Sequence, residues 1–345
     1  MHMDIFRSSA FSLVAMTTAL ENVPFVPQRL GELGIFGSKP ITTEAFSVEM
    51  RDDVISLIQT TPRGTPGEQL DRQRANIRSL STRRLKKGDV IQAAEVQNMR
   101  AFGTETELQT VQGEVAQRII RLRRDLDLTH EYHRLGAVQG LLLDADGSTI
   151  YNFFTEFGVS QAAEVDFDLY NAAPVMGDIR RKCDAIVRAM QRAAKGAWTP
   201  GTRVHALVGD DFWDAFVNHA EVRQTYLNWE AAAALREGTA WAQFQFGGIT
   251  WENYRGTDDG STVAIGASKA KFFPVGAPEV FEVVWSPYEG SSAANTPGKP
   301  FYPLVLPDYT GRDQYVEIEL YSYPLFYCRR PAMLQRATAG TPPSS

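Results

Sequence analysis

Residues 104–143 constrain the fold more than any other segment, because they carry the pattern of one very long amphipathic helix. Apolar residues recur along it at spacings of three and four: Leu108, Val111, Val115, Ile119, Leu122 and Leu126. Thr104 and Glu107 form a capping box at its start, and residues 144–147 (DADG) are expected to stop it. A helix of about 38 residues spans roughly 57 Å. We expect it to lie across a sheet, with its basic side turned outward: Arg118, Arg121, Arg123 and Arg124.

The N-terminal segment, residues 1–40, predicts an extended arm. Prolines and glycines interrupt a mostly apolar string there, so the segment can form few internal backbone hydrogen bonds. Its apolar side chains, among them Phe25, Leu30 and Phe36, need a surface to lie against. That surface belongs either to their own subunit or to a neighbouring one, and we favour the neighbour.

Residues 41–90 predict a long, two-stranded, polar excursion from the body. Strand-like runs at 46–50 and 54–58 lead into a turn-rich stretch at 61–67. The returning segment, residues 71–87, holds seven basic residues and one acid, a balance of 7 − 1 = +6. A lone two-stranded ribbon is barely stable in water, so we expect this one to lie on another subunit. A mobile surface loop is the alternative.

The remaining segments predict a compact mixed domain followed by strands. Amphipathic helices are expected at 179–194 and 211–219. From residue 241 onward the strands are expected to form a run of hairpins, and the last strand alternates so that one face is buried and one is wet. The expected strands are 149–154, 204–208, 241–246, 249–254, 263–265, 280–285 and 315–323.

Composition excludes several classes of protein. The 345 residues are 43% hydrophobic and 22% charged, which is typical of a folded globular chain of two or three domains. A net charge of −6 argues against a protein that coats nucleic acid through its overall charge. Cys183 and Cys328 are far apart, which favours a reducing compartment over a disulfide-stapled fold. No window approaches the roughly 20 apolar residues that cross a bilayer, so we expect no membrane partner.

No enzyme motif is complete. Residues 130–133 (HEYH) are one residue shorter than the H-E-x-x-H zinc motif, and no third ligand stands out. Residues 144–147 open like a calcium loop, but its twelfth position is Thr155 rather than glutamate, and a hairpin turn explains these residues better. We expect no catalytic, cofactor-binding or metal-binding residues and no cofactor. A metal-dependent hydrolase that uses His130, Glu131 and His133 is the enzymatic alternative.

The order of these parts resembles the Hong Kong 97 phage capsid fold: arm, protruding ribbon, long helix, mixed domain and returning strand. Several segments resemble the lambda E-type family of phage major capsid proteins: FVPQRLGELGIF (25–36), RRLKKGD (83–89), FGGI (246–249), SYPL (322–325) and RP (330–331). The resemblance covers about residues 11–337. Its specificity comes from the shared order of the segments, since no single motif is a catalytic signature.

The resemblance implies an α+β fold in four parts: an N-terminal arm at 1–40, an extended loop at 41–95, a peripheral domain at 96–172 and 306–345 with the long helix as its spine, and a mixed α/β axial domain at 173–305. It implies a major capsid protein of the virion head that self-assembles as hexamers and pentamers, in the host cytoplasm, into an icosahedral shell around double-stranded DNA. The alternative is an encapsulin-like nanocompartment shell that encloses a cargo protein.

Further partners follow from the same resemblance. They are a separate scaffold protein, a portal, a decoration protein, and DNA contacted through phosphates without base readout. Candidate contacts between subunits are Arg72, Arg74, Arg78, Phe25, Leu30 and Phe36. The arginines would face acidic patches on the next subunit, and solvated arginines without a partner are the alternative. Some relatives join subunits by a lysine–asparagine bond, but residues 51–85 contain no lysine, so we expect none near the loop tip.

Overall fold

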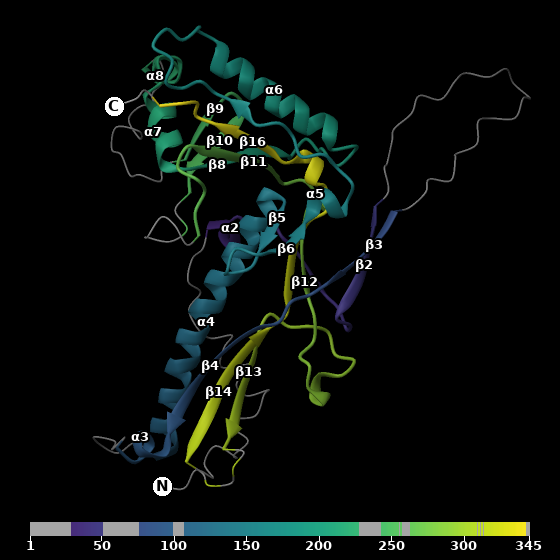
Figure 1. Cartoon of the computed structure of the whole chain (residues 1–345), viewed down its shortest axis with the longest axis vertical. Coiled ribbons are helices and arrows are strands. Elements are labelled where there is room, and N and C mark those ends of the chain that lie inside the picture. Colours follow the sequence, from purple (N-terminus) through teal and green to yellow (C-terminus); the bar gives the residue numbers. More distant parts are fainter. Residues whose placement is uncertain are drawn as a thin grey trace, which may run out of the picture.

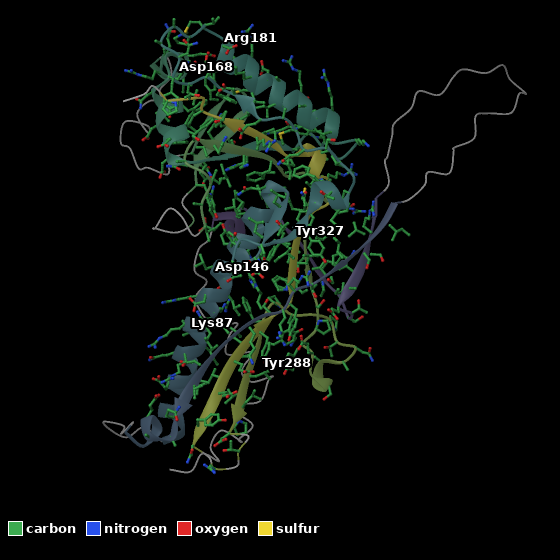
Figure 2. All side chains as sticks on the ribbon, in the orientation of Figure 1. Lys87, Asp146, Asp168, Arg181, Tyr288 and Tyr327 are labelled. Carbon is green, nitrogen blue, oxygen red and sulfur yellow. The ribbon has the colours of Figure 1, made fainter. Side chains whose placement is uncertain are left out.

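The computed structural model describes residues 29–50, 76–98, 107–227, 243–254, 256, 263–308, 310, 312 and 314–342. The molecule is elongated (Figure 1). A six-stranded sheet and its helices form one end, and a three-stranded sheet beside a long helix forms the other. Figure 2 shows the side chains of these parts in the same orientation.

Helix α4, Glu107–Gln139, is the long helix that the sequence predicts, with 33 residues and a length of roughly 50 Å. Its apolar stripe packs on strand β14 (Tyr315–Ser322), and these residues form one cluster: Val115, Ile119, Leu122, Leu126, Val316, Ile318 and Leu320. The predicted start at Thr104 lies outside the described residues. Of the helices in the described ranges, none is long and apolar enough to cross a membrane.

Helix α4 ends earlier than predicted. Gly140 follows it with φ of +79°, and residues 141–143 then form strand β5 (Leu141–Leu143), which pairs with β6 (Thr149–Asn152). Residues 144–147 are therefore the turn of this hairpin and do not stop the helix. A Cβ at Gly140 would collide with the ring of Phe154, so the position needs glycine for its backbone conformation and for this close approach.

The strand predicted at 149–154 is also shorter than expected. It ends at Asn152, whose side chain accepts hydrogen bonds from the backbone N–H groups of Phe154 and Thr155. This cap starts the short helix α5 (Phe153–Glu156).

The basic side of α4 is only partly turned outward, which corrects the prediction. Arg121 and Arg124 are exposed, but the side chain of Arg118 is 14% exposed and pairs with Asp89, Glu95 and Glu114. The guanidinium of Arg123 lies 5.1 Å from the ring centroid of Phe301 and pairs with Asp127. Acids on β4, on α3 (Ala93–Asn98) and on α4 itself thus draw these two arginines inward, while their long stems cover apolar surface.

The sheet beside α4 has the order β13-β14-β4, with β13 at Tyr302–Pro307 and β4 at Leu85–Gln92. Strand β4 pairs with β14 from Leu85↔Ser322 to Gln92↔Tyr315. Residues 85–90 therefore do not belong to the two-stranded excursion in which the sequence placed them. The face of β14 predicted to be wet is largely covered, since Glu319 and Tyr321 are buried and hydrogen bonded to each other.

The two-stranded ribbon consists of β2 (Ala45–Met50) and β3 (Asn76–Ser81), and the strand predicted at 46–50 is confirmed. The ribbon lies at the side of the molecule (Figure 1). Val48 and Leu80 are buried against the body. Ile77, on the same ribbon, is 66% exposed.

The six-stranded sheet has the order β7-β16-β11-β8-β10-β9. The strands are β7 (Val165–Asp166), β8 (Arg203–Val208), β9 (Phe244–Phe246), β10 (Ile249–Asn253), β11 (Lys269–Val275) and β16 (Gln335–Thr338). Both predicted helices of this part are confirmed, as α6 (Asp178–Ala193) and α7 (Asp210–Asn218), and α8 (Ala220–Leu227) follows.

The predicted run of hairpins is wrong in part. The Gly247–Gly248 turn does join β9 and β10. However, β8 lies between β10, to which it is parallel, and β11, to which it is antiparallel. Residues 263–265 are not a strand, and β11 was not predicted.

Alternation along β8 gives this sheet two apolar faces. Val204, Ala206 and Val208 pack with α6 and α7 around Trp251. Leu207 faces the other way, into a cluster with Leu30 and residues of α4. The six-stranded sheet thus lies between its own helices and the end of α4.

A third sheet, of order β1-β12-β15, lies between the two ends of the molecule. Its strands are β1 (Gly37–Pro40), β12 (Phe281–Trp285) and β15 (Pro324–Cys328). Strands β7 and β16 of the six-stranded sheet come from segments predicted to be peripheral, and β12 of this sheet comes from the predicted axial segment. The domain boundaries themselves remain predictions.

Replacing Gly140 by alanine should lower the free energy of unfolding by roughly 2–4 kcal/mol, because the left-handed backbone is strained and the methyl group meets Phe154. Urea unfolding of unassembled subunits measures the change. Gly113→Ala is the matched control: nothing lies within 4 Å of its added Cβ, and it should raise stability by about 0.5–1 kcal/mol. Equal effects at both sites would contradict the proposed role of Gly140.

Candidate assembly surfaces

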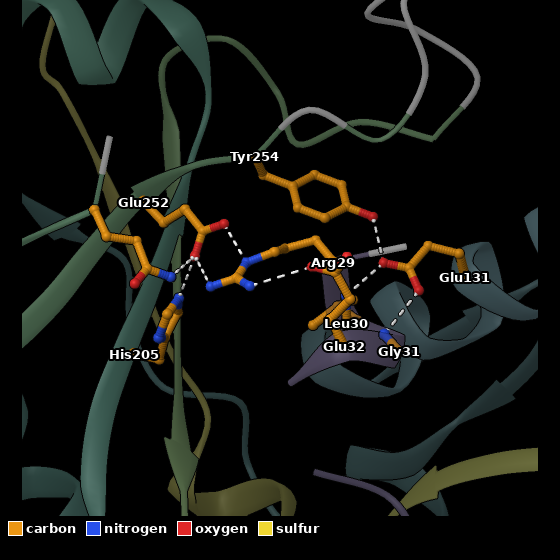
Figure 3. A network of polar contacts seen from close by, with 9 residues as sticks. Arg29, Leu30, Gly31, Glu32, Glu131, His205, Glu252 and Tyr254 are labelled. Carbon is orange, nitrogen blue, oxygen red and sulfur yellow. Dashed lines mark hydrogen bonds and ion pairs between the residues drawn. The ribbon is translucent and has the colours of Figure 1, made fainter. Parts of the chain in front are cut away.

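The described chain begins with the short helix α2 (Arg29–Glu32), which a polar network holds to the body (Figure 3). Glu131 of α4 accepts hydrogen bonds from the backbone N–H groups of Leu30 at 2.7 Å and Gly31 at 3.2 Å. The hydroxyl of Tyr254 donates to the same carboxylate at 3.3 Å. N–H groups in the first turn of a helix have no partner within that helix, and Glu131 satisfies two of them.

Arg29 forms the second attachment, to Glu252 of β10. Its Nη2 donates to Oε2 of Glu252 at 2.9 Å, and its Nε binds Oε1. The side chains of His205 and Gln243 reach the same Oε2 at 3.0 and 2.6 Å. Helix α2 is therefore bound to α4 at one point and to the six-stranded sheet at another.

The two carboxylates of this anchor have opposite pKa shifts. Burial raises the pKa of Glu131, and its hydrogen bonds with Leu30 and Arg134 do not fully offset that effect. Burial also acts to raise the pKa of Glu252, but hydrogen bonds from His205, Arg29 and Gln243 outweigh it and lower the pKa below the ordinary 4.5. A lowered carboxyl pKa stabilises the fold above the ordinary value, and this contribution is lost as pH falls through the lowered pKa.

Two of the predicted contact residues lie against their own subunit. Leu30 is 1% exposed and packs in a cluster with Leu135 and Val138 of α4. Phe36 is half-buried, with ring centroids 5.4 Å from Phe281 and 5.5 Å from Phe326. The sequence left open whether the arm lies on its own body or on a neighbour, and this part of the arm lies on its own body.

The ribbon carries the third predicted residue that the structure describes. Arg78 of β3 is exposed, and among the described residues it has no ion-pair partner. Arg72, Arg74 and Phe25 lie outside the described residues. The structure thus brings Leu30 and Phe36 to one apolar cluster at the base of the arm and places Arg78 on the ribbon.

The residues of the incomplete zinc motif, His130, Glu131 and His133, have structural surroundings. The ring Nε2 of His130 lies 3.0 Å from the hydroxyl oxygen of Ser322, and the ring stacks on Phe301. Glu131 holds α2. His133 is 1% exposed, and neither of its ring nitrogens has a hydrogen-bond partner in the described part of the chain. Within the described ranges, no three His, Cys, Asp or Glu side chains are grouped to hold a metal ion.

Sequence reasoning considered Glu131 only as part of an incomplete zinc motif, and it missed Glu252. One signal for the burial of the histidines was present: counted from Leu126, His130 and His133 continue the spacing of four and three that marks the apolar stripe of α4. Nothing in the local pattern of β10 marks Glu252, because its partners Arg29 and His205 lie 223 and 47 residues away in the sequence.

Two solved capsids of phages share this arrangement. The chain matches the capsid structure of the cyanophage P-SCSP1u with a TM-score of 0.51 and 9% identity, over 91% of this chain and 89% of that one. It matches the mature capsid of bacteriophage PhiM1 with a TM-score of 0.51 and 11% identity, over 91% and 88%. At such identities the likeness shows the fold alone, which is the α+β Hong Kong 97 capsid fold that the sequence predicts.

Sequence comparison then gives the family. The model of the family described as phage major capsid protein E matches residues 12–339, and the chain belongs to this family. The chain is also 27% identical, over 359 residues, to the major capsid protein of Salmonella phage Felix O1 (isolate Felix O1-VT1), covering 95% of this chain and 96% of that protein. The resemblance predicted from the sequence is confirmed, and so is the role as the major protein of a phage head.

Replacing Glu252 by glutamine should loosen α2, because the ion pair with Arg29 and the charge facing His205 are lost. We expect trypsin to cleave after Arg29 about tenfold faster or more in unassembled subunits, in line with about 1–3 kcal/mol for a hydrogen bond to a buried charge. Mass spectrometry of the released peptide measures the rate. Glu32→Gln is the control: its pair with Arg29 is exposed and should change the rate less than about twofold. Equal rates in the two variants would refute the anchor.

His133→Leu should make the subunit less sensitive to acid. Burial lowers the pKa of His133 to about 4, so between pH 6.5 and 4 the unfolded chain binds a proton that the folded chain does not. The free energy of unfolding therefore decreases as the pH is lowered through this window. Over the same window, the free energy of unfolding of the variant should decrease by roughly 2–4 kcal/mol less than that of the parent chain. Urea midpoints at a series of pH values measure this loss.

His130→Leu is the matched comparison for that experiment. It should destabilise the subunit at pH 7 by about 1–3 kcal/mol, because it leaves the buried hydroxyl of Ser322 without its partner. Among the described residues His133 has no such partner, so His133→Leu should not be destabilising at pH 7. An unchanged acid sensitivity in His133→Leu would contradict the assignment.

Proposed function

We propose that the chain self-assembles as hexamers and pentamers into an icosahedral shell that encloses double-stranded DNA in the virion head. The observation that carries the proposal is the β2–β3 ribbon, on which Ile77 is 66% exposed beside the exposed Arg78. A two-stranded ribbon is marginal by itself, and an exposed isoleucine on it favours a partner surface. Identical copies that meet head to tail can close into rings, and rings into a container.

The part of the arm that precedes α2, residues 1–28, contacts neighbouring subunits in this proposal. Its anchor at α2 supports this role, because the contacts with Glu131 and Glu252 fix the place from which the arm leaves its own body. Phe25, Arg72 and Arg74 keep their proposed roles at contacts between subunits, together with Arg78. Leu30 and Phe36 act at the base of the arm.

The shell protein acts without catalysis in this proposal, since the residues of its nearest enzymatic motif hold the arm and fill the core. Its assembly takes place in the host cytoplasm with a scaffold protein, and a portal and a decoration protein join the shell. Contacts with the packaged DNA involve phosphates only and weaken with salt. The net charge of −6 supports local contacts rather than a uniformly basic lining.

Expression of the chain with and without its neighbouring genes tests the assembly. Light scattering and negative-stain microscopy should show closed polyhedral particles, or rings of six and five subunits. A small, discrete oligomer under every condition would refute the proposal.

Ile77→Asp should reduce the yield of particles by about tenfold or more, because a charge replaces an apolar side chain at the proposed contact. The urea midpoint of the unassembled subunit should hardly change, since Ile77 is exposed there. Ile77→Val keeps the apolar surface and should assemble within about twofold of the parent chain. If Ile77→Asp assembles normally, the ribbon does not make the contact.

A further inference from the structure

The loop before α6 exposes apolar side chains to solvent. Val175 is 67% exposed and Met176 56% exposed, and Ala172 and Ala173 beside them are also exposed. Gly177 follows in the left-handed conformation, with φ of +87°, and starts the helix. The loop therefore presents two adjacent large apolar side chains, which cost free energy while they face water.

A shallow depression of about 450 Å³ lies at the other end of α6. Its apolar walls come from Val187 on the helix, from Trp198 and Pro200 in the following loop, and from Val204 of β8. Hydrogen bonds between Thr199 and Thr202 hold that loop in place. The depression has room for two aliphatic side chains of moderate size.

The pair Val175 and Met176, called the knob below, and the depression cannot meet within one subunit. The length of α6 separates them by about 20 Å. The helix lies along one face of the six-stranded sheet, and its two ends point away from each other (Figure 1). Each end is thus free to contact a different copy of the chain. Such a contact is heterologous, and it continues from copy to copy until a ring closes.

Charge favours this pairing. The segment that holds Val175 and Met176, residues 166–182, and the helices α7 and α8 at this end of α6 contain seven acids and four bases, a balance of 4 − 7 = −3: Asp166, Asp168, Asp178, Asp210, Asp211, Asp214, Glu221, Arg180, Arg181, Lys182 and Arg223. Glu221 accepts hydrogen bonds from the backbone N–H groups of Ile179 and Arg180 at the start of α6. Burial together with the charges of Asp211 and Asp214 raises the pKa of Tyr170. Asp168 and Arg181 mark this end of the helix in Figure 2.

The depression has the opposite charge. Residues 185–204 contain four basic residues and no acid, a balance of +4: Arg188, Arg192, Lys195 and Arg203. The guanidinium of Arg203 donates to the backbone carbonyls of Pro200 and Thr202, and its described contacts include no carboxylate. An acidic rim around an apolar knob thus matches a basic rim around an apolar depression.

We propose that Val175 and Met176 of one subunit insert beside Trp198 of a second copy, and that this head-to-tail contact closes the ring of a capsomer. The inference rests on the proposed self-assembly and adds the surfaces that perform it. Helix α6 then acts as a spacer between a donor end and an acceptor end of each subunit.

A paired-cysteine variant, Met176→Cys with Gln191→Cys, tests the contact directly. Gln191 lines the depression and is exposed, and the native Cys183 and Cys328 are fully buried. The two new thiols are too far apart to join within one subunit. Oxidised glutathione added to assembled particles should convert most chains into disulfide-linked multiples, which disappear on reduction. The control pair, Met176→Cys with Leu306→Cys, should remain monomeric on the same gel.

Two outcomes would overturn the inference, and they differ in what they say of assembly. If particles form and the Met176–Gln191 pair yields no multiples, the contact is wrong and the proposed function stands. If the parent chain forms no particles at all, both are wrong. As a second measurement, Val175→Asp with Met176→Asp should reduce particle yield by about tenfold or more, whereas Leu306→Asp should stay within about twofold. Normal assembly of the double aspartate variant would also refute the contact.

Discussion

The burial of one apolar stripe along α4 is the interaction on which the rest of the structure depends. Its first half covers β14 through Val115, Ile119 and Leu122. Its second half joins the arm base and the six-stranded sheet through Leu135 and Val138. Because one rigid rod contributes to both clusters, the two ends of the molecule are placed relative to each other by the length and direction of a single helix.

Polar side chains replace the apolar stripe of α4 where the helix meets α2. The carboxylates there, Glu131 and Glu252, have structural roles. Glu131 remains close to the helix N-terminus that it caps, although burial raises its pKa. Glu252 gathers enough hydrogen bonds to hold its charge in a buried position. Residues 130–133 resemble a catalytic motif in the sequence, but in the structure Glu131 attaches α2 to α4. This structural role agrees with membership of a capsid protein family.

Local patterns in the sequence predicted the elements that local forces determine. Spacing of apolar residues gave α4, α6 and α7, and alternation gave β14. Pairing between distant segments escaped prediction, since β4 joins β14 across more than two hundred residues. Strand β11 contains Pro274, a residue that argues against a central strand. For the candidate contacts, residue type marked Leu30 as apolar, but only the fold shows that its own subunit covers it.

The two attachments of α2 make it a strap across a joint. One end of the strap is fixed to α4 at Glu131, and the other is fixed to β10 at Glu252. If the six-stranded sheet rotated away from α4, the strap would come under tension and one attachment would have to break. A change of angle inside one subunit would therefore pull on the base of its arm, so that strain between α4 and the six-stranded sheet is transmitted to residues 29–32.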